Sequence, residues 1–378
     1  MIETALVALS LNRFRSHTDA QFELSPKPVV LFGANGTGKT NVLEAISLLA
    51  PGRGLRRAPY AQAVQRGSDQ PWAIHAVLAH PDGEFQIGTG LTPSANGQSR
   101  RVRIDGQNAS AGALARLVRQ VWLTPAQDRI FSGPRGVRLK YFDRLVFSLF
   151  PGHGRAVNAY EKALRNRQRL LDEGRADPAW LDGLEQQMAE FGAQIHQARA
   201  ETVRRLRLEI ESRAEGAFPK ADLAISGHEV LASFTMEQEP KIEATLKDAL
   251  AQHRELHAKA GRTLHGPHRA DLAVAWGAGE MPAADCSTGE QKALLVGLSL
   301  AHARAVTADA QAPPPLILLD EACAHLDENR RAALIEEINQ LQGQAWLTGT
   351  DRSLFEAFGD HAQFFELSDV GIVPRSCG

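Results

Sequence analysis

Three short apolar runs predict the strands of a parallel sheet. They occupy residues 28–32, 316–319 and 344–348. Strands with consecutive apolar residues are typical of parallel sheets, because helices cover such sheets on both faces. A predicted helix at residues 328–341 separates the second run from the third, which gives the strand–helix–strand order of a βαβ unit.

Alternating apolar and polar residues predict antiparallel strands in the first third of the chain. Apolar positions recur at every second residue between residues 72 and 90, and Asp82-Gly83 within this stretch is a hairpin-turn pair. Residues 1–32 are also predicted to form antiparallel strands, at residues 5–9 and 21–24 and then in the apolar run before residue 33.

The middle of the chain has the pattern of helices instead. Apolar residues recur at spacings of three and four in two long charged stretches, residues 154–174 and 179–213, which are predicted to pair as a short antiparallel helix hairpin. The predicted fold class is therefore α/β, with a mixed sheet and a parallel core. Residues 1–136 and 262–378 form this discontinuous domain, and residues 137–261 form an inserted, mainly helical domain.

Composition adds little to the fold prediction, but it indicates in which cellular compartment the protein is expected. The chain has 378 residues, of which 43% are hydrophobic and 23% charged, as in a soluble globular protein. It has no apolar run of about 18 residues, the length of a membrane span, and its first residues do not resemble a signal peptide. Its three cysteines form no C-x-x-C pair, which argues against disulfides or a zinc site and suits the cytosol.

The net charge of −2 conceals an uneven distribution. Residues 1–150 have a net charge of +8, whereas residues 214–378 have −11. A basic half beside an acidic half is compatible with binding a polyanion on one face, although solvated surface charge is the more usual explanation.

Residues 33–40 fit the P-loop pattern G-x-x-x-x-G-K-[ST] and stand between an apolar strand and a predicted helix. Glycines allow the backbone to wrap around a phosphate, and the helix N-terminus favours the negative charge. Lys39 is then expected to reach the β- and γ-phosphates of a nucleotide, and the Thr40 hydroxyl to bind Mg²⁺. The alternative, a chance glycine turn before a helix, does not account for all eight positions.

A second motif, which carries two carboxylates, follows the apolar run at residues 316–319. A strand there would carry Asp320 to the carboxyl edge of the sheet, beside the P-loop, where it can hold Mg²⁺. Glu321 is placed to orient an attacking water or accept its proton. Buried strands often end in an acid, so this Walker B signal is weak alone and strong when paired with a P-loop.

Residues 287–291, Ser-Thr-Gly-Glu-Gln, precede a long apolar helix and have two interpretations. Ser287 with Glu290 three residues later is a capping box. The segment also matches the ABC-type signature, a helix N-terminus that binds the γ-phosphate of ATP held by a partner subunit. The order of P-loop, signature and Walker B favours the second interpretation. Residues 324–327 occupy the place of a D-loop, and Asp327 suits the N-cap of the next helix.

These motifs resemble the RecF family, bacterial recombination mediators among the SMC-like ABC ATPases. The resemblance rests on residues 13–17, 33–44, 266–272 and 287–291, and on Asp320-Glu321 with residues 325–327. It covers essentially the whole chain, and its most specific marks are the G-P-H-R-x-D-L strand at residues 266–272 and the short helical insert. It implies that the α/β domain is an ABC-type P-loop ATPase head.

The resemblance also implies roles for individual residues. The implied catalytic residues are Glu321, Asp320 and Lys39, and the implied metal ligands are Thr40 and Asp320. The nucleotide-binding residues are Gly33, Ala34, Asn35, Gly36, Thr37, Gly38, Lys39, Thr40 and Asn41, with Arg15 and Ser16 from the N-terminal turn. Ser287, Gly289 and Gln291 act in trans, and Asp327 belongs to the D-loop. Two departures from ABC ATPases are that residues 348–351 contain no switch histidine and that Gln127 matches a Q-loop glutamine only loosely.

The implied activity is that of a DNA clamp. ATP and Mg²⁺ are the expected cofactors, and ATP drives a homodimer that binds double-stranded DNA and single-strand/double-strand junctions in gapped DNA. Slow hydrolysis releases the clamp, which works with RecR and, through it, RecO to load RecA in recombinational repair and replication restart. The expected location is the cytoplasm, at the nucleoid, with no membrane partner.

The candidate DNA contacts are arginines, which bind phosphates without reading sequence. They are Arg53, Arg56, Arg57, Arg135 and Arg138, with Arg100, Arg101 and Lys140 as further candidates. Any single one of these residues is more often a plain surface charge.

Two other functional classes remain open from the motifs. An ABC-type ATPase subunit coupled to a membrane or other protein partner would share them. However, Ser287 follows Lys39 by 248 positions, and the segment between them holds a larger helical domain than such subunits carry. A non-catalytic, nucleotide-gated binding protein is the other class, and Glu321 argues against it.

Overall fold

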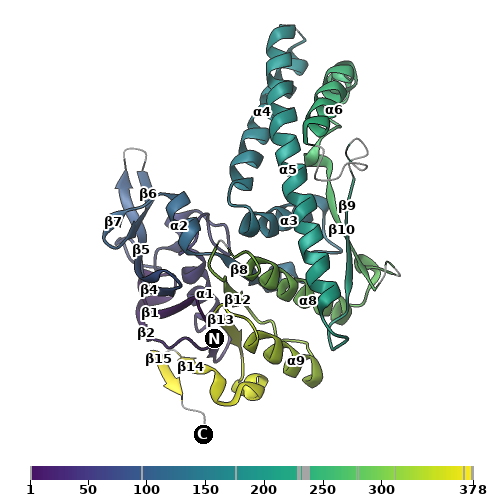
Figure 1. The fold of residues 1–378 in the computed structure, drawn as a ribbon. Helices are drawn as coiled ribbons and strands as arrows, with labels where there is room; N and C mark the ends of the chain where they lie inside the picture. The colour runs from purple at the N-terminus through teal and green to yellow at the C-terminus, as the bar shows by residue number, and fades with distance from the viewer. Residues whose placement is uncertain are drawn as a thin grey trace. The chain divides into compact units, whose positions relative to one another are not determined.

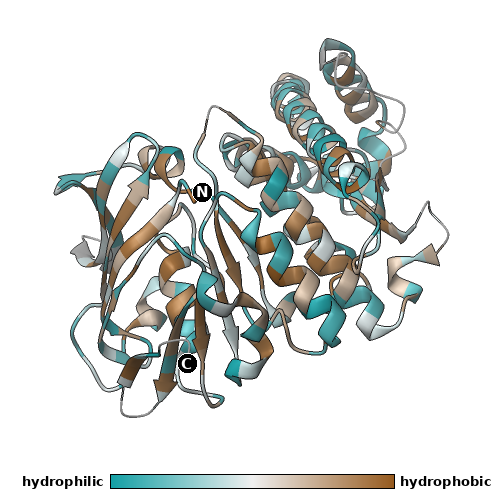
Figure 2. Cartoon of the chain, turned by 60° about the horizontal axis from the view of Figure 1, so that its bottom comes forward, coloured by the Kyte–Doolittle hydropathy of each residue, from teal (hydrophilic) through white to brown (hydrophobic). Residues whose placement is uncertain are grey.

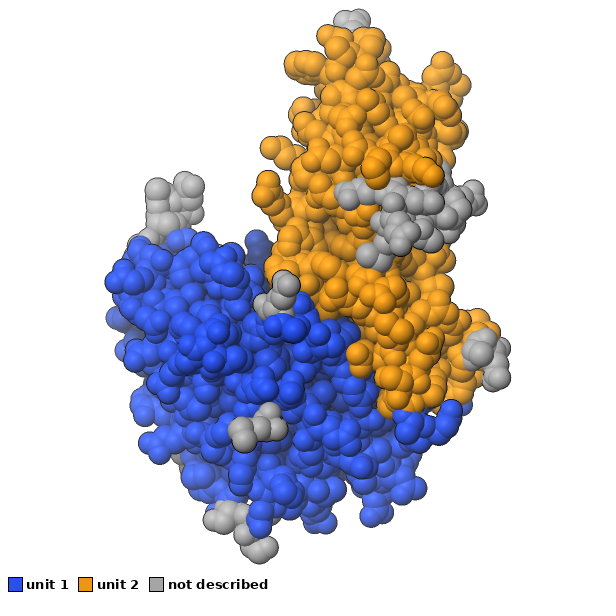
Figure 3. All heavy atoms as spheres, viewed as in Figure 1, with its two compact units in different colours: residues 1–128, 214–219, 287–378 blue, residues 129–213, 220–286 orange. Residues whose placement is uncertain are grey.

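The computed structural model in Figure 1 describes residues 2–94, 97–174, 177–227, 231, 239–277, 279, 281–310, 312–368 and 371–375. The chain forms two compact units, shown in Figure 3. Unit 1 comprises residues 1–128, 214–219 and 287–378, and unit 2 comprises residues 129–213 and 220–286. The sequence pattern assigns residues 129–136 and 262–286 to the α/β domain, whereas in the structure they lie in unit 2. It assigns residues 214–219 to the helical insert, whereas they lie in unit 1.

Unit 1 contains a six-stranded sheet with the order β15-β14-β3-β13-β12-β8 among the residues described. The strands are β3 (Val29–Phe32), β8 (Gln120–Leu123), β12 (Leu316–Leu319), β13 (Ala345–Gly349), β14 (Gln363–Ser368) and β15 (Gly371–Arg375). All neighbours are parallel except β14 and β15. The predicted βαβ unit is confirmed, since α9 (Glu328–Asn339) connects the parallel neighbours β12 and β13.

The second sheet of unit 1 is antiparallel and has the order β2-β1-β4-β5-β6-β7. Its strands are β1 (Ala5–Phe14), β2 (His17–Glu23), β4 (Ala73–His80), β5 (Gly83–Ser94), β6 (Gly97–Ile104) and β7 (Gln107–Asn108). The predicted hairpin is confirmed, but its turn falls on Pro81 and Asp82, one residue earlier than expected. The prediction that residues 28–32 form a strand of the parallel sheet is confirmed, because β3 pairs in parallel with β13 and β14. The grouping of this run with the antiparallel strands of residues 1–32 is wrong.

The core of unit 1 joins the two sheets through helix α1 (Lys39–Ser47). Phe22 from β2 lies edge-on to Trp346 from β13 and to Phe365 from β14, with ring centroids 6.1 and 5.3 Å apart. Figure 2 shows hydrophobic residues along the strands of the sheets. The further helices of the unit are α2 (Ala111–Leu117), α8 (Thr288–Thr307), and the 3₁₀ segments η1 (Tyr60–Ala63), η2 (Pro125–Gln127) and η7 (Arg352–His361).

Unit 2 is built on long helices and a small sheet. The helices are α3 (Arg135–Leu149), α4 (His153–Glu173), α5 (Pro178–Ser212), α6 (Glu239–Gln252) and α7 (Arg254–Lys259). Figure 1 shows α4 and α6 beside α5. The antiparallel strands β9 (Ala221–Ser226), β10 (Asp271–Trp276) and β11 (Met281–Pro282) accompany the 3₁₀ turns η5 (Pro267–Arg269) and η6 (Ala283–Asp285). In the part of the chain that is described, no helix is long and apolar enough to cross a membrane.

The core of unit 2 holds a buried ion pair. The guanidinium of Arg167 on α4 is fully buried and donates from Nε to Glu185 Oε1 on α5 at 2.9 Å. Its other nitrogens donate to Thr263 Oγ1 at 3.0 Å and to the Leu250 carbonyl at 2.8 Å. Arg254, at the start of α7, also contacts Glu185. One carboxylate therefore joins three helices.

Two histidines of this unit are held neutral. His257 is fully buried, and burial together with the charge of Arg167 lowers its pKa to about 4. Burial also lowers the pKa of His268 to about 4. The Nε2 of His268 lies 3.0 Å from the Thr263 carbonyl, and its Nδ1 lies 2.8 Å from the Tyr160 hydroxyl. The neutral ring satisfies both contacts, with Nε2 donating and Nδ1 accepting.

These pKa values predict that unit 2 loses stability on acidification. Between pH 6.5 and about 4, the unfolded chain protonates His257 and His268 while the folded chain does not, so the free energy of unfolding falls as the pH falls. Urea unfolding followed at about pH 7.5, 6.0 and 4.5 should show a decreasing midpoint. The slope with pH should become smaller in His257→Gln. An equal slope in that variant would contradict the assignment.

Candidate nucleotide site

The glycines of the P-loop adopt backbone conformations that other residues rarely reach. Gly33, Gly36 and Gly38 have φ values of 140°, 89° and 97°. A Cβ on Gly33 would lie 2.2 Å from the Leu367 carbonyl oxygen, and one on Gly38 would lie 2.6 Å from Ser16 Oγ. The loop runs from the end of β3 into α1, whose N-cap is Gly38. This strand, loop and helix form the cradle that a phosphate needs.

Lys39 is the buried cation of the loop. Its Nζ donates to the carbonyl oxygens of Gly33 and Ala34, both at 2.7 Å. Burial lowers the pKa of Lys39, while the charges of Glu321 and Asp320 act in the opposite direction. The ammonium group is thus enclosed by loop carbonyls, within the electrostatic reach of both Walker B acids.

Thr40 and Asp320 meet at the carboxyl edge of the parallel sheet, as the motif order predicted. The Thr40 hydroxyl lies 2.9 and 3.1 Å from the two carboxylate oxygens of Asp320. A hydroxyl and a carboxylate are hard oxygen donors, which fit Mg²⁺. Among the described residues there is no group of three His, Cys, Asp or Glu side chains that could hold a metal ion. Mg²⁺ bound here would take its remaining ligands from phosphate and water, as is usual for this ion.

The N-terminal turn is fastened to α1. Arg15 donates from Nε and Nη2 to the two carboxylate oxygens of Glu44 at 2.9 and 2.6 Å, and from Nη1 to the Gln62 carbonyl. Ser16 Oγ accepts from Asn41 Nδ2 at 2.8 Å. Ser16 and Asn41 are therefore brought to the P-loop, while the guanidinium of Arg15 is engaged by Glu44. No local spacing pattern signals this ion pair.

The signature segment is a capping box, which confirms one of its two interpretations. Ser287 Oγ accepts from the Glu290 amide, and Glu290 Oε2 accepts from the Ser287 amide at 2.7 Å. Five residues after Ser287, Lys292 donates to Asp128 Oδ1 at 2.7 Å. This buried lysine ties α8 to the segment that follows β8. The roles of Ser287, Gly289 and Gln291 in trans stay predictions.

The remaining predicted residues occupy defined positions. Asp327 Oδ1 accepts from the Arg330 amide at 2.9 Å, which confirms that Asp327 is the N-cap of α9. Glu321 follows Asp320 with a φ of 51°. Gln127 Oε1 accepts from the Thr124 amide in a capping box, and its buried Nε2 has no partner among the described residues. The side-chain oxygen of Gln127 is thus already hydrogen-bonded within its own turn.

The candidate DNA-binding arginines differ in their surroundings. Arg53, Arg56 and Arg57 are exposed on the loop after α1, and Arg56 lies 3.5 Å from the carboxylate of Glu44 on that helix. Arg138 instead pairs with Asp271 through two contacts of 2.8 and 2.5 Å, and Arg135 donates to the Arg269 carbonyl. Within unit 2, these last two arginines therefore fasten α3 to β10 and η5.

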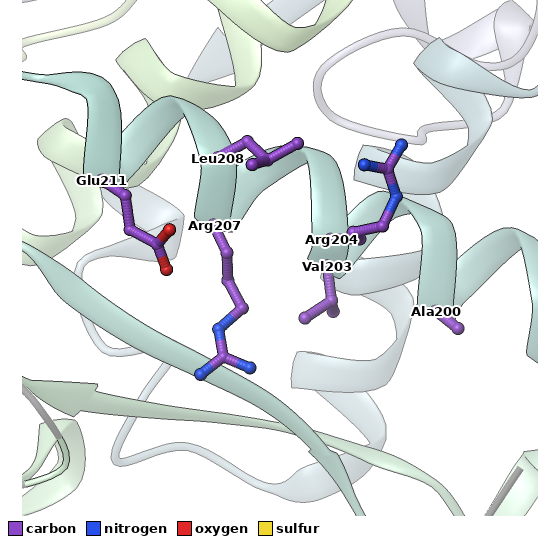
Figure 4. A pocket seen from close by; sticks show the side chains of 6 residues that line it. All are labelled: Ala200, Val203, Arg204, Arg207, Leu208 and Glu211. Atoms are coloured by element: carbon purple, nitrogen blue, oxygen red, sulfur yellow. The ribbon is translucent and has the colours of Figure 1, made fainter. Parts of the chain in front are cut away.

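A hollow of about 350 Å³ lies along α5, and none of its lining residues belongs to the predicted site (Figure 4). Its lining comes from one helix: Ala200, Val203, Arg204, Arg207, Leu208 and Glu211. Arg204 pairs with Glu201, and Arg207 pairs with Asp222. Because both cations have carboxylate partners, the hollow does not offer a second phosphate site.

Comparisons with known proteins identify the family of the chain. The family model described as "RecF/RecN/SMC N terminal domain" matches residues 5–366. A curated protein from Mesorhizobium japonicum named "DNA replication and repair protein RecF" is 47% identical over 374 residues, which cover 98% of each chain. A protein of the same name from Agrobacterium fabrum is 47% identical over 375 residues, again 98% of each chain.

Solved structures show the same fold. The structure of the "recombination mediator protein RecF-ATPrS in RecFOR pathway" superposes with a TM-score of 0.83 at 23% identity, covering 99% of each chain. An Smc head domain derived from Pyrococcus furiosus superposes with a TM-score of 0.54 at 14% identity, covering 99% of this chain and 96% of that one. The predicted α/β fold of an ABC-type head is thereby confirmed. By its full-length match to the curated relatives, the chain belongs to the RecF family of DNA replication and repair proteins.

Proposed function

We propose that the chain is an ATPase that clamps DNA as an ATP-dependent homodimer. The observation that carries this proposal is the contact between Thr40 and Asp320, which brings the P-loop and the Walker B strand together at one sheet edge. The name of the curated relatives, and the solved structure of a relative described as RecF-ATPrS, support the same activity.

Each group at this edge has a part in hydrolysis. The amides of residues 33–41 and the Lys39 ammonium bind the phosphates, and Thr40 with Asp320 holds Mg²⁺. Mg²⁺ neutralises charge on the β- and γ-phosphates when it is bound. Glu321 orients the attacking water and accepts its proton. Arg15 acts indirectly, because its guanidinium binds Glu44 on α1 and not the nucleotide.

The dimer follows from the one P-loop and the one signature segment of the chain. A signature that binds the partner's γ-phosphate, through Ser287, Gly289 and Gln291, requires two chains to meet head to tail about a two-fold axis. The capping box is compatible with this role, because it leaves the helix N-terminus in place as a dipole for the phosphate. Asp327 in the D-loop would lie at the same interface.

The DNA-bound clamp would act in repair of gapped DNA and replication restart. Arg53, Arg56 and Arg57 are the stronger candidates for phosphate contacts, because all three are exposed. In this proposal the clamp binds double-stranded DNA and single-strand/double-strand junctions at the nucleoid in the cytoplasm, and works with RecR and RecO to load RecA. Hydrolysis is slow and releases the DNA.

Sedimentation of the protein with ATP and Mg²⁺, with and without gapped duplex DNA, tests the proposal. We expect the wild-type chain to form a dimer that retains the DNA only when ATP is present. Lys39→Ala should abolish the dimer because ATP is not bound. Ser287→Arg should abolish it while ATP binding to the monomer persists. A monomer that is indifferent to ATP and DNA would contradict the proposal, and co-purification with membranes would favour a membrane-coupled ATPase.

A further inference from the structure

Thr348 is the first residue of the segment 348–351, in which the chain lacks the switch histidine of ABC ATPases. It is on β13, which is paired on one side with the P-loop strand β3 and on the other with the Walker B strand β12. Leu347 is in register with Leu319, so Thr348 reaches the level of Asp320, and it is only 1% exposed. A polar side chain buried between these two strands needs hydrogen-bond partners.

The Thr348 hydroxyl contacts both Walker B residues. It donates to Asp320 Oδ1 at 2.7 Å and accepts from the Glu321 amide at 2.9 Å. The direction of these two hydrogen bonds is fixed, because an amide N–H only donates and an ionised carboxylate only accepts. One hydroxyl thus orients the side chain of the metal ligand and the backbone of the next residue.

The backbone at Glu321 needs such support. Its φ of 51° lies in the left-handed region, which is unfavourable for a non-glycine residue and persists only where surrounding contacts hold it. The Thr348 hydroxyl supplies one of these contacts, and the bond from the Ala324 amide to the Glu321 carbonyl, at 3.1 Å, supplies another.

We infer that Thr348 is a positioning residue for hydrolysis. Its hydroxyl orients the carboxylate of the Mg²⁺ ligand Asp320 and fixes the backbone of the base Glu321. Thr40 donates to the same carboxylate from the side of the P-loop. The Asp320 carboxylate is therefore held by hydroxyls from α1 and from β13. This inference rests on the proposed ATPase function and adds a residue that no motif marks.

Thr348→Val is the central variant, because valine has the shape of threonine without the hydroxyl. We expect kcat for ATP hydrolysis to fall, or the Mg²⁺ concentration for half-maximal activity to rise, by ~10–100-fold, as is typical when a residue supporting a metal ligand is lost. Thr348→Ser should restore most of the activity. ATP affinity measured in EDTA should be unchanged in all variants, because the glycine loop and Lys39 are intact.

The matched control is Thr4→Val. Thr4 is also fully buried in unit 1, but its hydroxyl has no partner among the described residues, so this variant should keep wild-type kinetics and Mg²⁺ dependence. If Thr348→Val does not fold, Thr348→Ala removes the same hydroxyl without adding volume. Wild-type turnover and Mg²⁺ dependence in a folded Thr348→Val protein would overturn the inference while the ATPase stands. A wild-type chain that binds no ATP would overturn the proposed function, and this inference with it.

Discussion

Replacement of Glu321 by glutamine is expected to lower kcat for ATP hydrolysis by ~10²–10⁴-fold, the usual contribution of a general base. The amide has the shape of the carboxylate but cannot accept the proton of the attacking water. Asp320, Thr40 and Lys39 are unchanged, so ATP and Mg²⁺ should still bind. The variant should therefore accumulate as an ATP-bound dimer.

Phosphate release and sedimentation with ATP together measure this effect. Glu336→Gln is the matched control, because Glu336 is exposed on α9 and its substitution should change neither the rate nor the dimer. Wild-type turnover in Glu321→Gln would mean that another group activates the water. Loss of the dimer together with turnover would instead place Glu321 among the groups that close the interface.

Replacement of Glu185 by glutamine is expected to lower the free energy of unfolding of unit 2 by about 3–5 kcal/mol, the cost of removing one partner from a buried ion pair. Arg167 is fully buried, and Glu185 is its only carboxylate contact among the described residues. Without that carboxylate, the guanidinium charge would remain in the core with only neutral oxygens around it. Arg254 would lose a contact as well.

Chemical denaturation, followed by a spectroscopic signal from unit 2, measures this loss. Glu161→Gln is the control, because Glu161 and Arg165 form an exposed pair on α4 whose loss should cost less than about 1 kcal/mol. An equally small effect for Glu185→Gln would show that Arg167 is solvated in the folded state. Replacing Arg167 and Glu185 together by Met and Leu should recover much of the stability, because the buried guanidinium is removed with its partner and Arg254 keeps its contact with Asp182.

Several features could be predicted because their signals lie within a few residues. The P-loop, the N-cap at Asp327 and the capping box at Ser287 each depend on residues that are near neighbours along the chain. The contact of Thr40 with Asp320, 280 residues apart, was also predictable. Both residues follow apolar strands, and the carboxyl ends of parallel neighbouring strands share one edge.

The assignment of strands to sheets could be predicted only in part. The apolar run of β3 predicts a place in the parallel sheet, whereas its position along the chain groups it with β1 and β2. In the structure β3 pairs with β13, more than 300 residues later. The physical reason is visible in burial: four of the seven residues of β2 are exposed, whereas the first three residues of β3 are buried. Such a strand is stable only between parallel neighbours covered by helices on both faces.

Residues close together along the chain predict a nucleotide-binding loop, a Walker B acid pair, a signature segment and an inserted helical region. The side chains that support these motifs are seen only in the folded chain. Arg15 with Glu44, Lys292 with Asp128, and Thr348 with Asp320 are pairs from different elements. None has a fixed spacing along the chain, because each depends on the packing of distant segments rather than on local backbone geometry.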